Sequence, residues 1–277
     1  MAVTTSTAQT QPPPRSTANI RATAVARELG RWVLRLVLFG LLLGVWEFIV
    51  VNDWVREIIV PRPTDIFANF FQTITSSDIF PHMSVTMQET LAGFAIGSSV
   101  GLGLALIVIL APGMTFVLQD YITAFQSIPK VVFIPILITW FGFGMESKIY
   151  LAAMISFFPV YITSVVGMNG TPTPALRLMV LMRANRIQRL YKLQFLHALP
   201  TIFAGLKNAF TNSLIGAIVA EFFGATEGLG YLIVVHNHAL RIPEVFSLII
   251  ILSLLAVIGY TILDWAGKRI CFWMPSS

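Results

Sequence analysis

Charged residues are scarce in this chain. Only 11% of its 277 residues are Asp, Glu, Lys or Arg, whereas 56% are hydrophobic. Soluble domains carry roughly 25% charged residues, so a surface of this composition is poorly suited to water. The mean hydropathy of +0.79 favours lipid as the solvent around most of the chain.

Cysteine and the common catalytic and metal-binding motifs are also lacking. Cys271 is the single cysteine, which excludes an internal disulfide framework and a cysteine-based metal site. The histidines form no HExxH pattern, and neither a GxxxxGK[ST] phosphate-binding loop nor a GxSxG nucleophile elbow occurs. We therefore expect that the chain is not an enzyme, binds no metal or cofactor and does not hydrolyse ATP itself.

The sequence is rich in long apolar segments. A helix needs about 20 mostly apolar residues to cross a bilayer, and it satisfies its own backbone hydrogen bonds in lipid. The predicted fold class is an all-α integral membrane protein with six transmembrane helices. The predicted spans lie at about 36–51, 91–111, 114–142, 149–168, 203–224 and 245–264.

The two ends of the chain differ from the apolar middle. Residues 1–30 are rich in Thr, Ala, Pro and Gln and have no packing period, which predicts a disordered tail. The transmembrane domain is expected over residues 31–270, followed by a short C-terminal tail over 271–277.

Basic residues collect on one side of these spans. Twelve lie in the N-terminal tail, between the fourth and fifth spans and at the C-terminus, whereas the opposite loops hold Arg56, Arg62, Lys148 and Arg241. Because cytoplasmic loops carry the excess of Lys and Arg, both termini and the 169–200 segment are expected in the cytoplasm. That topology requires an even number of spans. It also explains the net charge of +5 without nucleic acid binding.

The third span contains Pro129, Lys130 and Pro135. Residues 114–142 are too many for one upright helix, and proline removes a helical donor. We expect a kinked or broken helix that lines a cavity, with a steeply tilted helix as the alternative.

The second span carries Gly93, Gly97 and Gly101 at four-residue steps. Such a stripe of small residues allows two helices to approach closely. Helix packing is the favoured interpretation, and a sliding surface for conformational change is the alternative.

Four ionisable residues lie within or near spans, where charge is costly and usually faces a bundle interior or a wet pathway. Glu47 and Lys207 lie near span ends and are interpreted as structural. Lys130 and Glu221 lie toward the outer halves of their spans. They could pair with each other or line an outer gate, and a purely structural role is the alternative.

The 171–199 segment is long for a connection, and its apolar residues recur at helical steps. Basic residues at positions 183, 186, 189 and 192 cover about half of the circumference of such a helix. This pattern favours contact with a membrane surface or a partner protein, with a lipid-facing anchor as the plainer alternative.

Several stretches, in this order, resemble the permease subunits of binding-protein-dependent ABC importers, in the branch that serves nitrate, aliphatic sulfonates, taurine, and thiamine or riboflavin precursors. The resemblance covers about residues 36–268. The matching stretches include Pro61-Arg62-Pro63-Thr64-Asp65, Leu91-Ala92-Gly93-Phe94, Gln126-Ser127-Ile128-Pro129-Lys130, Trp140-Phe141-Gly142-Phe143-Gly144, Gly216-Ala217-Ile218-Val219-Ala220-Glu221 and Gly228-Leu229-Gly230-Tyr231.

The resemblance implies a type I importer permease (MetI-like) fold in the bacterial cytoplasmic membrane, working by alternating access. It implies a separate ATPase dimer that binds ATP with Mg²⁺, a soluble binding protein that delivers a small organic solute or oxyanion, and a second permease copy. Similarity around residues 204–231 leans toward heterocyclic or aromatic solutes over nitrate. A stand-alone secondary transporter or channel is the alternative, and it would need buried proton relays in several spans.

The resemblance also implies a coupling motif, which in the family begins Glu-Ala-Ala, contains a Gly and ends near Leu-Pro. Counting back from Pro200, the motif is degenerate, and Arg at the Gly position predicts a continuous helix through residue 183. The residues expected to contact the ATPase are Arg177, Leu178, Met179, Arg183, Ala184, Asn185, Arg186 and Arg189. The candidates for the translocation path or gate are Gln126, Ser127, Pro129, Lys130 and Glu221.

Overall fold

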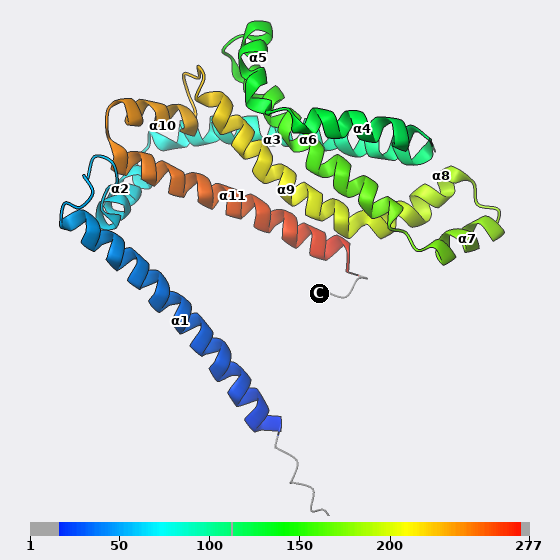
Figure 1. Ribbon diagram of the computed structural model, residues 1–277, viewed down its shortest axis with the longest axis horizontal. Helices are drawn as coiled ribbons and strands as arrows, with labels where there is room; N and C mark the ends of the chain where they lie inside the picture. The colour runs from blue at the N-terminus through cyan, green and yellow to red at the C-terminus, as the bar shows by residue number, and fades with distance from the viewer. Residues whose placement is uncertain (1–16, 112, 273–277) are drawn as a thin grey trace, which may run out of the picture. The chain divides into compact units, whose positions relative to one another are not determined.

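The computed structural model describes residues 17–111 and 113–272, and the elements within these ranges are helical (Figure 1). The chain divides into two compact units, Met1–Thr64 and Asp65–Ser277. The prediction for residues 1–16 and 273–277 lies outside the described residues.

Helix α1, Thr17–Val51, makes up most of the described part of the first unit. It begins inside the segment that was predicted to be a disordered tail, because residues 17–30 are rich in Ala, Arg, Glu and Leu, which favour helix. Its stretch Gly30–Val51 is long and apolar enough to cross a membrane. The Glu47 carboxylate accepts hydrogen bonds from the Thr64 backbone N–H at 3.3 Å and from Thr64 Oγ1 at 2.9 Å, which supports a structural role.

Three long helices form the centre of the second unit: α3 (Ile79–Leu110), α6 (Met145–Asn169) and α9 (Phe195–Glu221), with α11 (Ile242–Ile270) packed along α9 (Figure 1). The shorter elements are α2 (Pro63–Thr75), α4 (Met114–Ser127), η1 (Lys130–Phe133), α5 (Ile134–Phe141), α7 (Thr173–Leu181), α8 (Arg186–Arg189), the π-helix η2 (Leu190–Gln194) and α10 (Leu229–His238).

Glycine lets α3 and α6 approach closely. A Cβ atom on Gly97 would meet the Ser156 hydroxyl and the Ala153 carbonyl, and one on Gly101 would lie 2.7 Å from the Phe157 carbonyl oxygen. The Ser156 hydroxyl also donates to the Gly93 carbonyl at 3.2 Å. The packing interpretation of the glycine stripe is therefore confirmed.

These contacts also fix the direction of the helices. Successive glycines of α3 meet successive residues of α6, so the two helices run parallel. Gly167 of α6 meets Ala198, near the start of α9, whereas Ala152 meets Gly216, near its end, so α9 runs antiparallel to α6. The chain must therefore return through the thickness of the bundle between α3 and α6.

That return is the third predicted span. Its two halves, Asp120–Ser127 and Lys130–Phe141, meet at an angle of 81°. Ile128 and Pro129 between them are extended, with ψ angles of 128° and 112°, because proline disfavours helical geometry in the residue before it. The expectation of a broken helix is confirmed.

By length and composition, five helices of the described residues can cross a membrane, and the broken pair makes six. Some boundaries differ from the predicted ones: α3 begins at Ile79 rather than near residue 91, and the fifth candidate span runs from Arg186 to Glu221 rather than from about 203. Both helices continue into polar sequence, which a hydropathy window leaves out.

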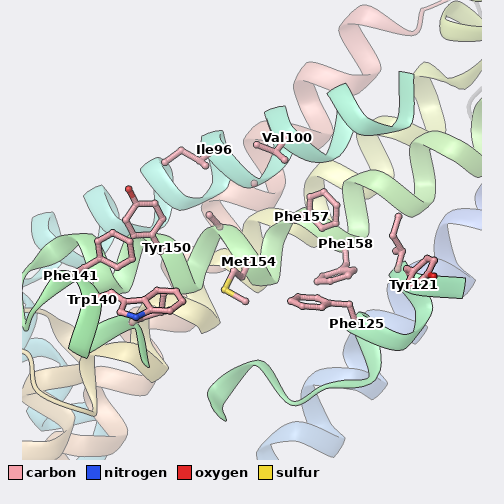
Figure 2. Close-up of a pocket in the computed structure, with 14 residues that line it drawn as sticks. Ile96, Val100, Tyr121, Phe125, Trp140, Phe141, Tyr150, Met154, Phe157 and Phe158 are labelled. Atoms are coloured by element: carbon pink, nitrogen blue, oxygen red, sulfur yellow. The ribbon is translucent and has the colours of Figure 1, made fainter. Parts of the chain in front are cut away.

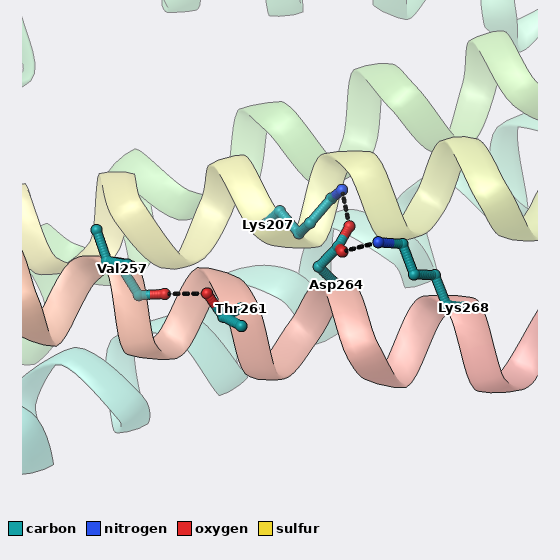
Figure 3. Close-up of polar contacts among 5 residues, drawn as sticks. All are labelled: Lys207, Val257, Thr261, Asp264 and Lys268. Atoms are coloured by element: carbon teal, nitrogen blue, oxygen red, sulfur yellow. Dashed lines mark hydrogen bonds and ion pairs between the residues drawn. The ribbon is translucent and has the colours of Figure 1, made fainter. Parts of the chain in front are cut away.

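Lys207 is held by the packing of α9 against α11. Its Nζ lies 2.7 Å from Asp264 Oδ1, and Lys268 Nζ lies 2.7 Å from Asp264 Oδ2 (Figure 3). The Lys207 ammonium also lies 5.0 Å from the centroid of the Tyr260 ring. These contacts support the structural role expected for Lys207.

Candidate functional site

The break between α4 and α5 brings four of the five predicted path residues together. Gln126 and Ser127 end α4, Pro129 precedes η1, and Lys130 begins η1. The Lys130 ammonium donates to the Gln126 carbonyl and lies 4.6 Å from the centroid of the Phe158 ring. Gln126 also lines a cavity of about 500 Å³ between α4 and α6.

Beside this break lies an aromatic pocket of about 580 Å³, which the sequence alone did not predict. Figure 2 shows side chains of α3, α4, α5 and α6 pointing into it. Phe125 stacks on Phe158 with ring centroids 6.1 Å apart, and Phe141 lies 4.3 Å from Tyr150. The lining residues labelled in Figure 2 are Ile96, Val100, Tyr121, Phe125, Trp140, Phe141, Tyr150, Met154, Phe157 and Phe158.

Glu221, the fifth path candidate, does not lie at the break between α4 and α5. It is buried in the bundle, where its carboxylate accepts hydrogen bonds from Thr86 Oγ1 at 2.6 Å and from the Gly230 backbone N–H. Glu89 and Lys148 interact electrostatically with Glu221 and with each other. Within the described residues no ion pair joins Glu221 to Lys130, so the suggested pairing of these two is wrong.

Sequence reasoning passed over Glu89 and Lys148. Glu89 lies before the apolar run that marked the second span, and Lys148 was assigned to an outer loop. The structure places both inside the bundle, because α3 starts earlier and the chain before α6 folds back onto Lys148. The sequence did contain a signal for Glu89, because this residue lies one helical turn before Gly93 and therefore on the same helix face as the glycine stripe.

A polar pocket of about 410 Å³ lies between α2, α3, α10 and α11. Its walls include Asp78, His82, His236, Arg241 and Glu244. Burial lowers the pKa of His236, and the Arg241 charge acts in the same direction while the Glu244 carboxylate opposes both. His236 is therefore favoured in its neutral form.

The 171–199 segment is helical, as predicted, but it is not continuous. Arg183 adopts a φ of 56°, in the left-handed region, and α7 ends there. The Ala184 N–H donates to the Met179 carbonyl at 2.9 Å and the Arg183 N–H to the Val180 carbonyl at 2.9 Å, which is the Schellman motif that ends many helices. The predicted continuous helix through residue 183 is wrong, because these bonds outweigh the unfavourable conformation of a non-glycine residue.

A new helix starts directly after this turn. The Asn185 side chain accepts from the Gln188 N–H at 2.7 Å, and the Gln188 side chain accepts from the Asn185 N–H at 2.9 Å. This capping box fixes where α8 begins. From Arg186 the chain then runs through the π-helix and α9 to Glu221 as one stretch of 36 residues.

The turn carries an exposed apolar and basic surface, which we call the coupling surface. Leu178, Leu181 and Met182 are 58%, 80% and 70% exposed. The side chains of Arg177, Arg183, Asn185 and Arg186 are exposed around them, whereas Met179, Ala184 and Arg189 are half-buried. Exposed apolar patches with a polar rim are typical of contact with a partner protein or a membrane.

A family model described as "Binding-protein-dependent transport system inner membrane component" matches residues 115–271. The chain belongs to this family. It is 31% identical over 235 residues to an ABC transporter permease protein of Haemophilus influenzae, with 84% of this chain and 95% of the relative covered. It is 29% identical over 236 residues to the riboflavin transport system permease protein RibX of Chloroflexus aurantiacus, with 85% and 88% covered.

Solved structures share the fold of this permease. The MetNI methionine ABC transporter in an inward-facing conformation gives a TM-score of 0.53 at 19% identity, covering 78% of this chain and 99% of that chain. Relatives named for formylaminopyrimidine, taurine and nitrate transport belong to the branch expected from the sequence. The predicted family, fold class and function are confirmed. The chain is a multi-pass membrane protein and the permease subunit of an ABC importer.

Proposed function

We propose that two copies of this permease form the translocation path of an ATP-driven importer in the bacterial cytoplasmic membrane, with both termini in the cytoplasm. The basic coupling surface and the basic end of α11, Lys268 and Arg269, support this orientation. They share one end of the second unit, because Gly267 of α11 packs against Phe203 near the start of α9. Such an excess of basic residues marks the cytoplasmic side.

The coupling surface receives a separate ATPase dimer, which binds ATP with Mg²⁺. Exposed apolar side chains surrounded by arginines suit an apolar groove with an acidic rim on that partner. Closure of the ATPase dimer on ATP then brings the two coupling surfaces together. This surface is the observation that carries the proposal.

The movement reaches the membrane through the uninterrupted stretch from Arg186 to Glu221. A force on the turn before Arg186 displaces α9 directly, because no flexible loop separates the two. Since α9 packs on both α6 and α3, the displacement alters the packing of the central helices. This sequence of contacts provides alternating access.

A soluble binding protein delivers the substrate, a small organic solute, to the outer side. The broken span at Gln126–Lys130 and the adjacent aromatic pocket line the route. Aromatic walls suit planar, heterocyclic solutes. Relatives named for riboflavin and formylaminopyrimidine transport handle solutes of the same class.

Charge reversal of the coupling surface tests the proposal. We expect Arg183→Glu together with Arg186→Glu to lower ATP-driven uptake into proteoliposomes by about tenfold or more, because each tenfold step needs only about 1.4 kcal/mol of lost docking energy. The amount of ATPase that co-purifies with the tagged permease should fall in parallel, while membrane insertion stays normal.

Arg269→Glu is the matched control, since it removes a basic residue at the same end of the second unit but outside the coupling surface. It should leave uptake and co-purification unchanged. Full uptake by the double variant, or uptake by the wild type without ATP, would overturn the proposal.

A further inference from the structure

Among the Asp, Glu, Lys, Arg and His side chains whose burial the structure describes, three are buried, and all three lie in one cluster. Glu89 of α3, Lys148 of α6 and Glu221 of α9 are 2%, 3% and 1% exposed. Lys148 interacts electrostatically with both carboxyl groups. Glu146, which also acts on Lys148, is exposed. The buried cluster therefore contains two carboxyl groups and one ammonium group.

The two carboxyl groups act on each other electrostatically. Glu89 follows Thr86 by about one turn of α3, and the Thr86 hydroxyl donates to Glu221 Oε1 at 2.6 Å, so both carboxyl groups lie on this face of α3. Two carboxylates that are buried in the same cluster repel each other and have no proton to share, so their burial favours a carboxylic acid at one of them. Charge balance gives the same result, because two buried negative charges beside one positive charge leave an uncompensated charge in the interior.

The surrounding donors identify the charged member. Glu221 accepts from Thr86 Oγ1 at 2.6 Å and from the Gly230 N–H at the start of α10. Donors at a helix N-terminus favour a carboxylate. Glu89 Oε2, in contrast, is buried without a hydrogen-bond partner among the described residues. Glu89 is thus the neutral acid of the pair.

The cluster joins two connections of the chain that meet at one end of the central helices. Lys148 Nζ donates to the Gly144 carbonyl at 2.9 Å and to the Phe143 carbonyl, in the turn that follows the broken span. On the other side, Glu221 holds Gly230, and the Gly228 N–H donates to His82 Nδ1 at 3.0 Å. His82 in turn stacks on Tyr231.

The close approach in this region depends on glycine. Gly228 has a φ of 116°, and a Cβ atom there would overlap the Glu221 carboxyl group. Gly224, with a φ of 129°, lies against the Phe143 ring, where a Cβ atom would be 2.7 Å from Cε1. The turn after the broken span and the connection between α9 and α10 are therefore packed together around the cluster.

We propose that Glu89 and Glu221 hold one proton between them, with Lys148 as the counter-ion, and that these positioning residues tie the broken span to the α9–α10 connection during transport. The positioning role rests on the proposed function. The shared proton does not, because it follows from burial and hydrogen bonding alone.

Infrared spectroscopy of the purified permease in nanodiscs tests the proton directly. We expect a C=O stretching band of a protonated carboxylic acid in the wild type at neutral pH, and loss of that band in Glu89→Gln. Glu146→Gln, the exposed control, should retain the band. An unchanged band in Glu89→Gln, or no band in the wild type, would overturn the assignment. This measurement needs no transport, so it stands even if the proposed function fails.

Transport kinetics test the positioning role. Glu89→Gln should keep ATP-driven uptake within about twofold of the wild type, because the amide replaces a neutral donor. Glu221→Gln and Lys148→Met should lower uptake about tenfold or more while ATP hydrolysis continues, because each leaves a buried charge without its partner. Lys148→Arg should restore part of the uptake. The role is refuted if Glu89→Gln is as impaired as Glu221→Gln, or if ATP hydrolysis and uptake fall together in Lys148→Met.

Discussion

At the scale of single residues, Arg183 adopts a backbone conformation that residues other than glycine disfavour. The left-handed conformation costs a non-glycine residue about 1–2 kcal/mol, yet Arg183 adopts a φ of 56°. The hydrogen bonds of the Schellman motif before it and the capping box after it determine the turn. The turn at residue 183 thus forms without a glycine.

Replacing this residue separates its conformation from its charge. Arg183→Gly should raise the stability of the solubilised permease by up to about 1 kcal/mol, because glycine adopts this conformation without the steric cost. Arg183→Val should lower stability, since a β-branched residue is least tolerated there. Thermal unfolding followed by tryptophan fluorescence measures both.

The control is Arg177→Gly, the same substitution inside helix α7. It should cost about 1 kcal/mol, because glycine weakens a helix interior. If Arg177→Gly and Arg183→Gly destabilise the permease equally, the left-handed turn at residue 183 is incorrect.

At the scale of elements, the central helices are held together by small residues. Gly93 and Gly97 of α3 face α6, where Ala152, Ala153 and Ser156 provide an equally small surface. Lipid tails are as apolar as most side chains, so close packing and hydrogen bonds drive helix association in a membrane. The position of a glycine on the helix therefore matters more than its presence.

Two identical substitutions on α3 test this dependence. Gly97→Ala should destabilise the permease by about 1–3 kcal/mol, the usual cost of overpacking, because its Cβ atom would meet Ser156 and the Ala153 carbonyl. Gly103→Ala should be tolerated, since no atom lies within 4 Å of the added Cβ atom. Similar midpoints of thermal unfolding for the two variants would contradict the parallel packing of α3 and α6.

At the scale of the whole molecule, the parallel course of α3 and α6 indicates that the broken pair crosses the membrane and is not a re-entrant loop. Two parallel helices need a connection that returns across the bundle, and the broken pair is that connection. Met114, before the broken pair, and Glu146, after it, should therefore lie on opposite sides of the membrane.

Labelling of single-cysteine variants in a Cys271→Ser background measures this topology. Met114→Cys and Met182→Cys should react with a membrane-impermeant maleimide only from the cytoplasmic side, and Glu146→Cys only from the outside. All three positions are exposed or partly exposed in the second unit. Labelling of Met114→Cys and Glu146→Cys from the same side would show that the broken pair is a re-entrant loop.

Much of the architecture was predictable because it depends on local sequence. Low charge and long apolar runs are sufficient to indicate membrane helices. Pro129 predicts a break, since proline acts on its own helix and on the residue before it. The basic cluster at residues 177–192 predicts which end of the spans faces the cytoplasm, because orientation follows the number of basic residues rather than their contacts.

The tertiary structure decided what depends on contacts between distant residues. Thr86 and Glu221 are 135 positions apart, and their hydrogen bond belongs to a buried cluster that local sequence does not reveal. Glu89 and Lys148 can be recognised as members of this cluster only from the structure, because three helices bring the residues together. The aromatic pocket likewise draws on four separate elements. Composition and local pattern determined that this chain crosses a membrane and where its basic segments lie along the sequence. Only the packing of helices decided which charges it buries, because burial depends on neighbours that are far apart in the sequence.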